Sequence, residues 1–311
     1  MTAISVVMGV YNGAATLGAT IDSILAQTER DLELIVVDDG STDDTPRILA
    51  RYANHDSRVR IVTVQHHGLT RALIAGCAAA RGPLIARHDA GDLSHPRRFE
   101  MQKSLFDRHA DVVLASCWTQ FAGPELEPLS VMRGSGLALE PIDIIDPHAE
   151  HGVIDGPTHH GSVMFRRDAY ERAGGYRAAF RFGQDWDLWY RLAALGRYMT
   201  VAEVLYTART TPESISSGNQ RSQKMLAELS REALAARSNG QSDEDVLERA
   251  AQIGATAGHP RNARARGLHF IGEALRRNGD QRARRYLREA IAASPFSIRS
   301  WIRYLQSLRL R

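Results

Sequence analysis

Short apolar, β-branched runs alternate with helix-type segments through the first 86 residues, and this alternation constrains the fold more than any other feature. The first run, residues 4–10, reads Ile-Ser-Val-Val-Met-Gly-Val, and similar runs follow at 32–37, 59–64 and 83–86. Between them, apolar residues recur at helical spacing, with helices expected from residue 17 to about residue 27, then over 47–52 and 69–80. Thr45 and Pro46 are expected to form the N-cap and first position of the second helix. Such alternation with short loops predicts a doubly wound α/β sheet.

Polar and acidic residues follow these strands at the points where the strands end. Tyr11-Asn-Gly13 follows the first strand, Asp38-Asp-Gly-Ser41 the second and Arg87-His-Asp-Ala-Gly-Asp92 the fourth. Any one such cluster is more often a turn or a cap. Ligands bind at the carboxyl ends of strands in sheets of this kind, so three clusters there indicate a binding site. The sequence has neither a G-x-G-x-x-G segment after the first strand nor a P-loop motif, which disfavours dinucleotide and P-loop proteins.

Taken together, the motifs resemble those of family 2 glycosyltransferases of the GT-A fold. The resemblance runs in unbroken order over about the first 216 residues. Its segments are Ser5-Val-Val-Met-Gly-Val-Tyr-Asn12, Ile24-Leu-Ala-Gln-Thr28, Val36-Val-Asp-Asp-Gly-Ser-Thr-Asp43, Ala86-Arg-His-Asp-Ala-Gly-Asp92 with Pro96, His160-Gly-Ser-Val-Met164, Gly174-Gly-Tyr176 and Gln184-Asp185. It implies a GT-A-like catalytic domain over 1–216 with a mixed, mainly parallel sheet, and a helical, Arg-rich extension over 217–311.

The resemblance implies that the first strand ends hold a nucleotide-sugar donor. Tyr11 is expected to stack near the base, and Asp38 or Asp39 to accept a hydrogen bond from a base N–H. A carboxylate only accepts hydrogen bonds, which suits the imide N–H of uracil or thymine. For Asp38, capping of the following loop is the alternative. The expected nucleotide-binding residues are Val10, Tyr11, Asp38, Asp39, Arg71 and Asp89.

The segment around Asp89 occupies the place of the D-x-D motif, which in similar enzymes holds a divalent cation on the donor diphosphate. Asp89 and Asp92 are therefore the expected ligands of Mg²⁺ or Mn²⁺. The sequence departs from the pattern twice, because Gly91 stands where the principal ligand is expected and Thr211 where many relatives carry a histidine. If Arg87 or Arg166 clamps the diphosphate instead, no metal is needed. The histidines match no zinc motif and are expected at the surface or in the core.

Asp185 matches the second residue of a Glu-Asp motif, in which Gln184 replaces the glutamate. The resemblance assigns Asp185 as the base that takes the proton of the acceptor hydroxyl during an inverting displacement. An alternative is that Asp185 caps a helix over 186–195, which is compatible with that role. His160, Gln184, Trp186 and Arg166 are expected on the acceptor or phosphate side. For Arg166, capping of the start of the next helix is the alternative. Asp187 and Arg191 have the spacing of an i,i+4 ion pair.

The C-terminal hundred residues have helical periodicity over 222–236, 242–253, 263–277, 281–293 and 298–310, and the last three segments resemble one tetratricopeptide-like repeat. Residues 261–311 hold thirteen arginines, no lysine and three acidic residues. This basic surface favours an anionic partner such as membrane headgroups, or it is simply a solvated face. No nucleic-acid-binding motif accompanies it. The weak pattern of residues 134–151 suggests an insert over the acceptor side.

No run of about 18 apolar residues occurs, and the N-terminus lacks the charge pattern of a signal peptide. Cys77 and Cys117 are the only cysteines, which favours a reducing cytoplasm. The basic C-terminal helices would place the chain peripherally at the inner face of the membrane. The leading interpretation is an inverting glycosyltransferase that uses a UDP- or TDP-sugar and a glycan or lipid-linked acceptor in surface polysaccharide synthesis. The alternatives are a degenerate, non-catalytic nucleotide-sugar or glycan-binding module and a sugar-nucleotide nucleotidyltransferase.

Overall fold

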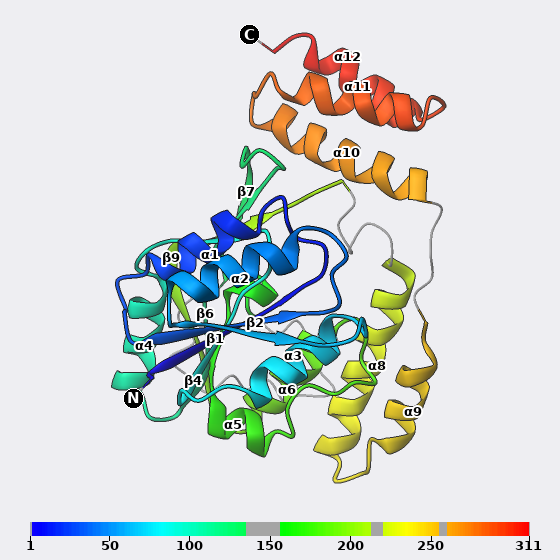
Figure 1. Cartoon of the computed structure of the whole chain (residues 1–311). Coiled ribbons are helices and arrows are strands. Elements are labelled where there is room, and N and C mark those ends of the chain that lie inside the picture. Colours follow the sequence, from blue (N-terminus) through cyan, green and yellow to red (C-terminus); the bar gives the residue numbers. More distant parts are fainter. Residues whose placement is uncertain (1, 135–155, 213–219, 255–259, 311) are drawn as a thin grey trace. The chain divides into compact units, whose positions relative to one another are not determined.

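The computed structural model of the chain describes residues 2–134, 156–212, 220–254 and 260–310 (Figure 1). Most of the insert expected over 134–151 lies outside the described residues, as do residues 213–216 at the end of the predicted catalytic domain. The chain forms two compact units. The first consists of Met1–Thr119, Met132–Ala208 and Leu226–Gln252, and the second of Gln120–Val131, Arg209–Met225 and Ile253–Arg311. The linear domain boundary at residue 216 stays a prediction.

A mixed sheet forms the centre of the first unit. Its parallel part has the order β3-β2-β1-β4, formed by β1 (Ile4–Val10), β2 (Leu32–Asp38), β3 (Val59–Thr63) and β4 (Leu84–Arg87). Beyond β4 the sheet continues through β8 (Met164–Arg166), β6 (Val112–Ala122), β9 (Arg197–Arg209) and β5 (Leu93–Ser94), with β8 antiparallel to both of its neighbours. A further strand, β7 (Pro128–Met132), pairs with β6. The expected mixed, doubly wound α/β fold is confirmed.

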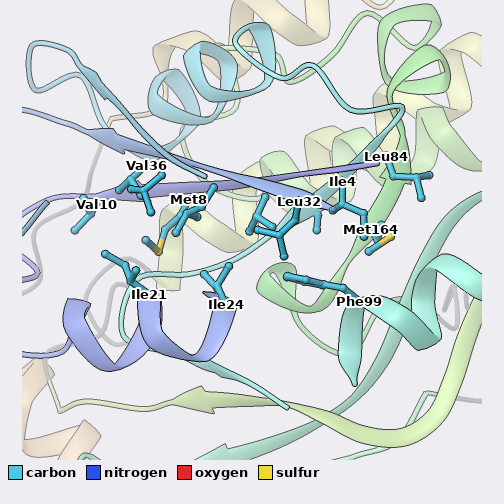
Figure 2. Close-up of a cluster of buried hydrophobic side chains, with 14 of the residues drawn as sticks. Ile4, Met8, Val10, Ile21, Ile24, Leu32, Val36, Leu84, Phe99 and Met164 are labelled. Carbon is cyan, nitrogen blue, oxygen red and sulfur yellow. The ribbon is translucent and has the colours of Figure 1, made fainter. Parts of the chain in front are cut away.

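Helices cover both faces of this sheet, because successive strand side chains point to opposite sides. In β1, Ile4, Met8 and Val10 join one apolar cluster, while Val7 joins the other. The first cluster is closed by α1 (Leu17–Leu25), α2 (Thr45–His55) and α4 (Arg98–Arg108), and Figure 2 shows Ile21, Ile24 and Phe99 against the strands. The second is closed by α3 (Leu69–Ala78), α5 (Arg167–Arg172) and α6 (Gln184–Ala193).

Two local expectations concern the start of α2 and the cysteines. Thr45 does not cap α2 but is its first residue, because Asp44 occupies the N-cap position and the Thr45 hydroxyl accepts a hydrogen bond from the Gly13 N–H. Cys77 and Cys117 are both free and buried, as expected for core thiols. Burial raises the pKa of Cys77 to about 12 and that of Cys117 to about 11, so neither is a reactive thiolate.

The five helices expected in the C-terminal region are present. They are α8 (Gln220–Ser238), α9 (Glu244–Gln252), α10 (Pro260–Arg277), α11 (Ala283–Ala293) and α12 (Ile298–Ser307). In the second unit, Leu268, Ile271 and Leu275 of α10 pack with Leu287 of α11 and with Leu129 of β7. Across the described part of the chain, no helix combines the length and apolarity needed to cross a bilayer.

A buried ion-pair network fixes α6, the helix that begins just before Asp185. Asp187 is fully buried and accepts hydrogen bonds from Arg177 (Nε, 3.0 Å) and from Arg191 (Nη2, 2.6 Å). Arg177 also pairs with Asp243 at 2.7 Å, which in turn pairs with Arg237. The expected Asp187–Arg191 pair is confirmed, and it is one part of this larger network.

We expect the substitution Asp187→Asn to lower the free energy of unfolding by about 3–5 kcal/mol, because it leaves the buried guanidinium of Arg191 without its carboxylate and removes one of the two carboxylates that pair with Arg177. Urea unfolding followed by circular dichroism measures the change. The matched control is Asp168→Asn on α5, since Asp168 is exposed and lies 3.8 Å from Arg172, a surface pair worth less than about 1 kcal/mol. Equal stability of the two variants would contradict a structural role for the network.

Candidate active site

The carboxyl ends of the parallel strands bring the predicted residues of the first two motifs to one edge of the sheet. Val10, the last residue of β1, is in register with Asp38, the last residue of β2. The Val10 carbonyl accepts a hydrogen bond from the Asp39 N–H at 2.9 Å, so the two strand ends are joined directly. Val10 itself is buried. Any contact that it makes with a ligand therefore involves its backbone.

Both carboxylates after β2 organise the loops around them. Asp38 Oδ1 accepts from the Ser41 N–H, which is the loop-capping alternative considered for this residue. Asp39 accepts from the N–H groups of His67 and Gly68, each at 2.9 Å, and thereby fixes the start of α3. A carboxylate has about four acceptor sites, so these bonds leave each residue able to accept from a nucleotide base.

An exposed aromatic surface lies beside these carboxylates. The Tyr11 ring stacks on the His66 ring, with centroids 3.9 Å apart, and Tyr11 is 47% exposed. His66 Nδ1 is 2.9 Å from Asp39 Oδ2, which holds the imidazole in place. Arg71 is exposed in the first turn of α3, just after the backbone that Asp39 fixes. The predicted base-binding residues therefore lie on adjoining loops at this strand edge.

The segment after β4 folds into a tight turn around the unexpected glycine. The Asp92 N–H donates to the Asp89 carbonyl at 3.2 Å, and Gly91 has a φ of +105°. Positive φ at the third position of a turn favours glycine. The Gly91 N–H is held by Thr20 Oγ1 at 3.0 Å. This turn brings Asp92 back beside Asp89, so the two carboxylates stand together although no residue between them carries one.

His159 completes a group of three metal-ligand side chains. Ligand atoms of Asp89, Asp92 and His159 all lie within 4.8 Å of one another, and His159 Nδ1 is 3.8 Å from Asp89 Oδ2 and 3.9 Å from Asp92 Oδ2. Burial lowers the pKa of His159, so its imidazole is neutral near pH 7. Its Nδ1 accepts a hydrogen bond from the Gly161 N–H, so this nitrogen carries no proton, and a cation bound at Nδ1 would take the place of that hydrogen bond. Two carboxylates and a neutral imidazole fit a hard or borderline divalent cation.

The sequence did not single out His159, because histidine spacing was compared only with zinc motifs. The signal lies in the topology. Since β8 runs antiparallel to β4, with Ala86 opposite Met164, the residues that precede β8 meet those that follow β4. His159 comes just before η1 (His160–Ser162), the short 3₁₀ turn that leads into β8.

Two further residues that were not in the predicted ligand set hold the acidic pair. The Tyr206 hydroxyl on β9 donates to Asp92 Oδ2 at 2.7 Å and accepts from the Asp89 N–H at 3.1 Å. The buried guanidinium of Arg87 donates to Asp89 Oδ1 at 2.5 Å. Although burial opposes it, the positive charge of Arg87 and the neighbouring histidines hold the pKa of Asp89 well below its ordinary value. Asp89 is therefore ionised at any pH at which the protein works.

Asp185 lies in the first turn of α6. Gly183, with a φ of +69°, occupies the N-cap position that was the alternative role for Asp185. The Asp185 carboxylate accepts from the Trp186 N–H at 3.0 Å and is half-buried. Burial raises its pKa to about 6, with a further upward contribution from the negative charge of Asp89. A carboxylate with a pKa near neutrality is suited to take up a proton.

An aromatic group surrounds the other residues expected on the acceptor side. His160 Nε2 is 2.9 Å from the Tyr176 hydroxyl, and the imidazole lies edge-on to the Trp189 ring. Trp186 packs edge-on against Trp189, which is buried in the core. Gln184 is buried at the first position of α6.

Arg166 does not lie where a phosphate-binding residue is needed. In β8, Arg166 is opposite Leu84, the first residue of β4. Asp89 lies at the other end, after the last residue of β4. Its guanidinium donates to the carbonyls of Val112, Phe106 and His109. Its observed role is to tie β8 to the end of α4 and the start of β6, and Arg87 is the arginine beside the acidic pair.

The comparisons with known proteins agree with the fold and with the arrangement of the motifs. Residues 5–173 match the model of the family described as Glycosyl transferase family 2. EpsE of Bacillus subtilis (strain 168), a protein named as a glycosyltransferase, is 35% identical over 213 residues, which are 66% of this chain and 72% of EpsE. The amylovoran biosynthesis glycosyltransferase AmsE of Erwinia amylovora is 29% identical over 216 residues, covering 68% of this chain and 78% of AmsE.

A solved structure has the same overall fold. The mannosyltransferase PcManGT from Pyrobaculum calidifontis, in complex with GDP-Man and Mn²⁺, superimposes with a TM-score of 0.55 over 98% of this chain and 85% of its own. At 18% identity this likeness supports the fold alone. The family model covers more than half of the chain, and EpsE is aligned over more than two thirds of its length. The chain therefore belongs to glycosyl transferase family 2 and is a glycosyltransferase.

Proposed function

We propose that the chain transfers a sugar from a nucleoside diphosphate donor to a hydroxyl of a glycan or lipid-linked acceptor, with inversion at the anomeric carbon, in the synthesis of a surface polysaccharide. The observation that carries this proposal is the half-buried Asp185, whose pKa of about 6 is shaped by burial and by the charges of Asp89 and Arg87. The relative AmsE, a glycosyltransferase of amylovoran biosynthesis by name, supports the polysaccharide assignment.

In the proposed reaction Asp185 removes the proton of the acceptor hydroxyl as its oxygen attacks the anomeric carbon. The bond from that carbon to the diphosphate oxygen breaks, and the nucleoside diphosphate leaves with the electron pair. The attack comes from the face opposite the leaving group, so one displacement inverts the configuration and no covalent enzyme intermediate is needed. Asp185 then carries the proton, which passes to solvent before the next turnover.

Asp89, Asp92 and His159 are the residues proposed to hold a divalent cation, Mg²⁺ or Mn²⁺. When bound, such an ion neutralises charge on the departing diphosphate. An imidazole ligand favours Mn²⁺, since Mg²⁺ prefers oxygen ligands and retains several waters. Tyr206 and Arg87 keep the two carboxylates aimed at a common point through the hydrogen bonds described above.

The donor base is proposed to stack on the exposed surface of the Tyr11 and His66 rings, beside the carboxylates that follow β2. A carboxylate that accepts from the imide N–H of uracil or thymine makes a UDP- or TDP-sugar the proposed donor. Arg71, exposed in the first turn of α3, supplies a positive charge close to the same loop. We place the reaction at the cytoplasmic side of a membrane, where the arginine-rich C-terminal helices meet anionic lipid.

We expect Asp185→Asn to lower the transfer rate by at least about 10²-fold while donor affinity stays nearly unchanged, because the base acts in the chemical step. Release of the nucleoside diphosphate during transfer measures the rate, and calorimetry with the donor measures affinity. Asp168→Asn on α5 is the control, since it removes an exposed carboxylate of the same kind. Near-normal turnover would remove Asp185 from the role of base.

The raised pKa of Asp185 gives two further expected results. Turnover per bound donor should decrease when the pH is lowered below about 6, because the base must be unprotonated. The folded state holds the Asp185 proton more tightly than the unfolded chain does, so protonation of Asp185 stabilises the folded state. This stabilisation is lost as the pH rises through about 6. Asp185→Asn should therefore unfold at a higher temperature than the wild type, by a margin that grows between pH 5 and pH 7. A margin that shrinks with pH would contradict the assigned pKa.

We expect a chelator to abolish transfer and added Mn²⁺ to restore it. Titration with Mn²⁺ in the presence of UDP, followed by electron paramagnetic resonance, measures binding apart from activity. His159→Ala should weaken Mn²⁺ binding by at least about ten-fold. His55→Ala, which removes an exposed histidine of α2, should leave binding unchanged. Full activity in chelator would overturn the metal assignment without touching that of Asp185.

We expect Tyr11→Ala to weaken binding of UDP by about ten-fold, in the range of about 1–3 kcal/mol for loss of one base stack. Calorimetry with UDP and with a UDP-sugar should show the same loss for both ligands, because the ring contacts the base. Val204→Ala, a change at a similarly exposed residue of β9, is the control. Equal affinities for both variants would place the base elsewhere.

A further inference from the structure

Helix α12 buries its serines and exposes its large apolar residues. Ser300 is 2% exposed and Ser307 is fully buried, whereas Trp301 is 45% and Leu305 58% exposed. This is the reverse of a surface helix that packs its apolar stripe on the core. The exposed residues, here named the α12 apolar face, are Phe296, Ile298, Trp301, Ile302, Leu305 and Leu308.

Polar contacts on the serine side fix this orientation. Ser300 Oγ is 3.1 Å from His269 Nδ1 of α10. Arg284 of α11 donates to the carbonyls of Ser307 and Leu310, and so holds the C-terminal end of α12. The small serine side chains let α12 approach its neighbours closely, and the bonds prevent it from turning its apolar side inward. The α12 apolar face is thus a built feature of the second unit.

Positive charge borders this face. Arg299 and Arg309 are exposed next to it, and Arg288 is exposed on α11. The sequence from residue 290 to residue 310 contains no acidic residue. Arginines beside exposed aliphatic and aromatic side chains are typical of helices that lie in the interface of an anionic membrane. The amphipathic ring of Trp301 is suited to the lipid headgroup region, where tryptophans are enriched.

We propose that α12 lies in the headgroup boundary of an anionic membrane, with the α12 apolar face among the acyl chains and Arg299 and Arg309 on lipid phosphates. The inference rests on the membrane location proposed above and identifies the surface by which the chain would bind the membrane. Each basic residue near such a surface contributes about 1 kcal/mol of attraction, and burial of the apolar side chains supplies the remainder.

A second copy of the chain fits this surface less well. Ten residues of helix are about 15 Å long, and a stable dimer buries about 800 Å² on each partner. One face of α12 supplies only part of that area. Two copies meeting there would also bring their arginines together, which opposes association. An anionic bilayer instead has both an apolar interior and phosphates at the required depth.

The test is flotation of the full chain with vesicles of phosphatidylcholine containing 30 mol% phosphatidylglycerol, compared with pure phosphatidylcholine. The wild type should bind the anionic vesicles and not the neutral ones. Trp301→Gln with Leu305→Gln should lower binding at least about ten-fold at both low and high salt. Arg299→Gln with Arg309→Gln should lower it by about five-fold per arginine at low salt, an effect that fades as salt screens the charge.

Matched controls keep the result specific to α12. Met225→Gln changes an apolar residue of α8 that is exposed to the same degree as Trp301, and Arg172→Gln removes an exposed charge from α5. Both should bind vesicles as the wild type does. All α12 substitutions are at exposed or partly exposed positions, and circular dichroism confirms folding. Donor binding, measured without vesicles, should be unchanged by them, so failure of the transferase proposal would be seen separately.

Absence of binding to anionic vesicles, or equal binding by the wild type and the Trp301→Gln, Leu305→Gln variant, would overturn the proposal. So would light scattering that shows a wild-type dimer which the same variant converts to a monomer, without any vesicle binding. In that case the α12 apolar face is an interface between copies.

Discussion

The antiparallel pairing of β8 with β4 is the constraint on which the candidate site depends. The parallel strands alone gather Tyr11, Asp38, Asp39 and Asp89 at one edge, a surface suited to a nucleotide. The reversal at β8 brings a segment from about 70 residues later in the chain to that same edge, so that His159 meets the turn after β4. Without this reversal no imidazole would lie beside the acidic pair to serve as a third candidate ligand. The chemistry therefore depends on a change of strand direction within one sheet.

A second constraint is that the charge of Asp185 lowers the stability of the folded state. Asp185 is kept half-buried close to another carboxylate, and at neutral pH this charge destabilises the fold. The buried network of Asp187, Arg177 and Arg191 begins two residues further along the same helix and fixes it. Buried, hydrogen-bonded ion pairs hold side chains in one geometry, so this network fixes the helix that carries Asp185. The carboxyl group with the raised pKa and the carboxylate at the centre of the ion-pair network thus lie within the first turn of one helix.

Much of this could be predicted from the sequence because it follows from local pattern. Buried β-branched runs predict the parallel strands, and acidic residues at the strand ends predict the site edge. The residues that escaped prediction, His159 and Tyr206, reach the acidic pair from distant strands whose pairing no local pattern encodes. Arg166 was wrongly expected at the phosphates, because a strand residue's position along the strand depends on register. Its place opposite Leu84 puts it at the far end of β4.

The turn at Gly91 compensates for the carboxylate that the motif lacks at this position. An aspartate at this position would need a φ of +105°, which side-chain-bearing residues rarely adopt, so the turn and the missing carboxylate belong together. The turn returns Asp92 to the acidic pair, where Tyr206 orients it. A degenerate binding module has no need to restore a ligand set, to hold it with a buried arginine, or to keep a half-buried carboxylate near neutrality. The joint presence of these costly features therefore favours a catalytic site over a site that only binds.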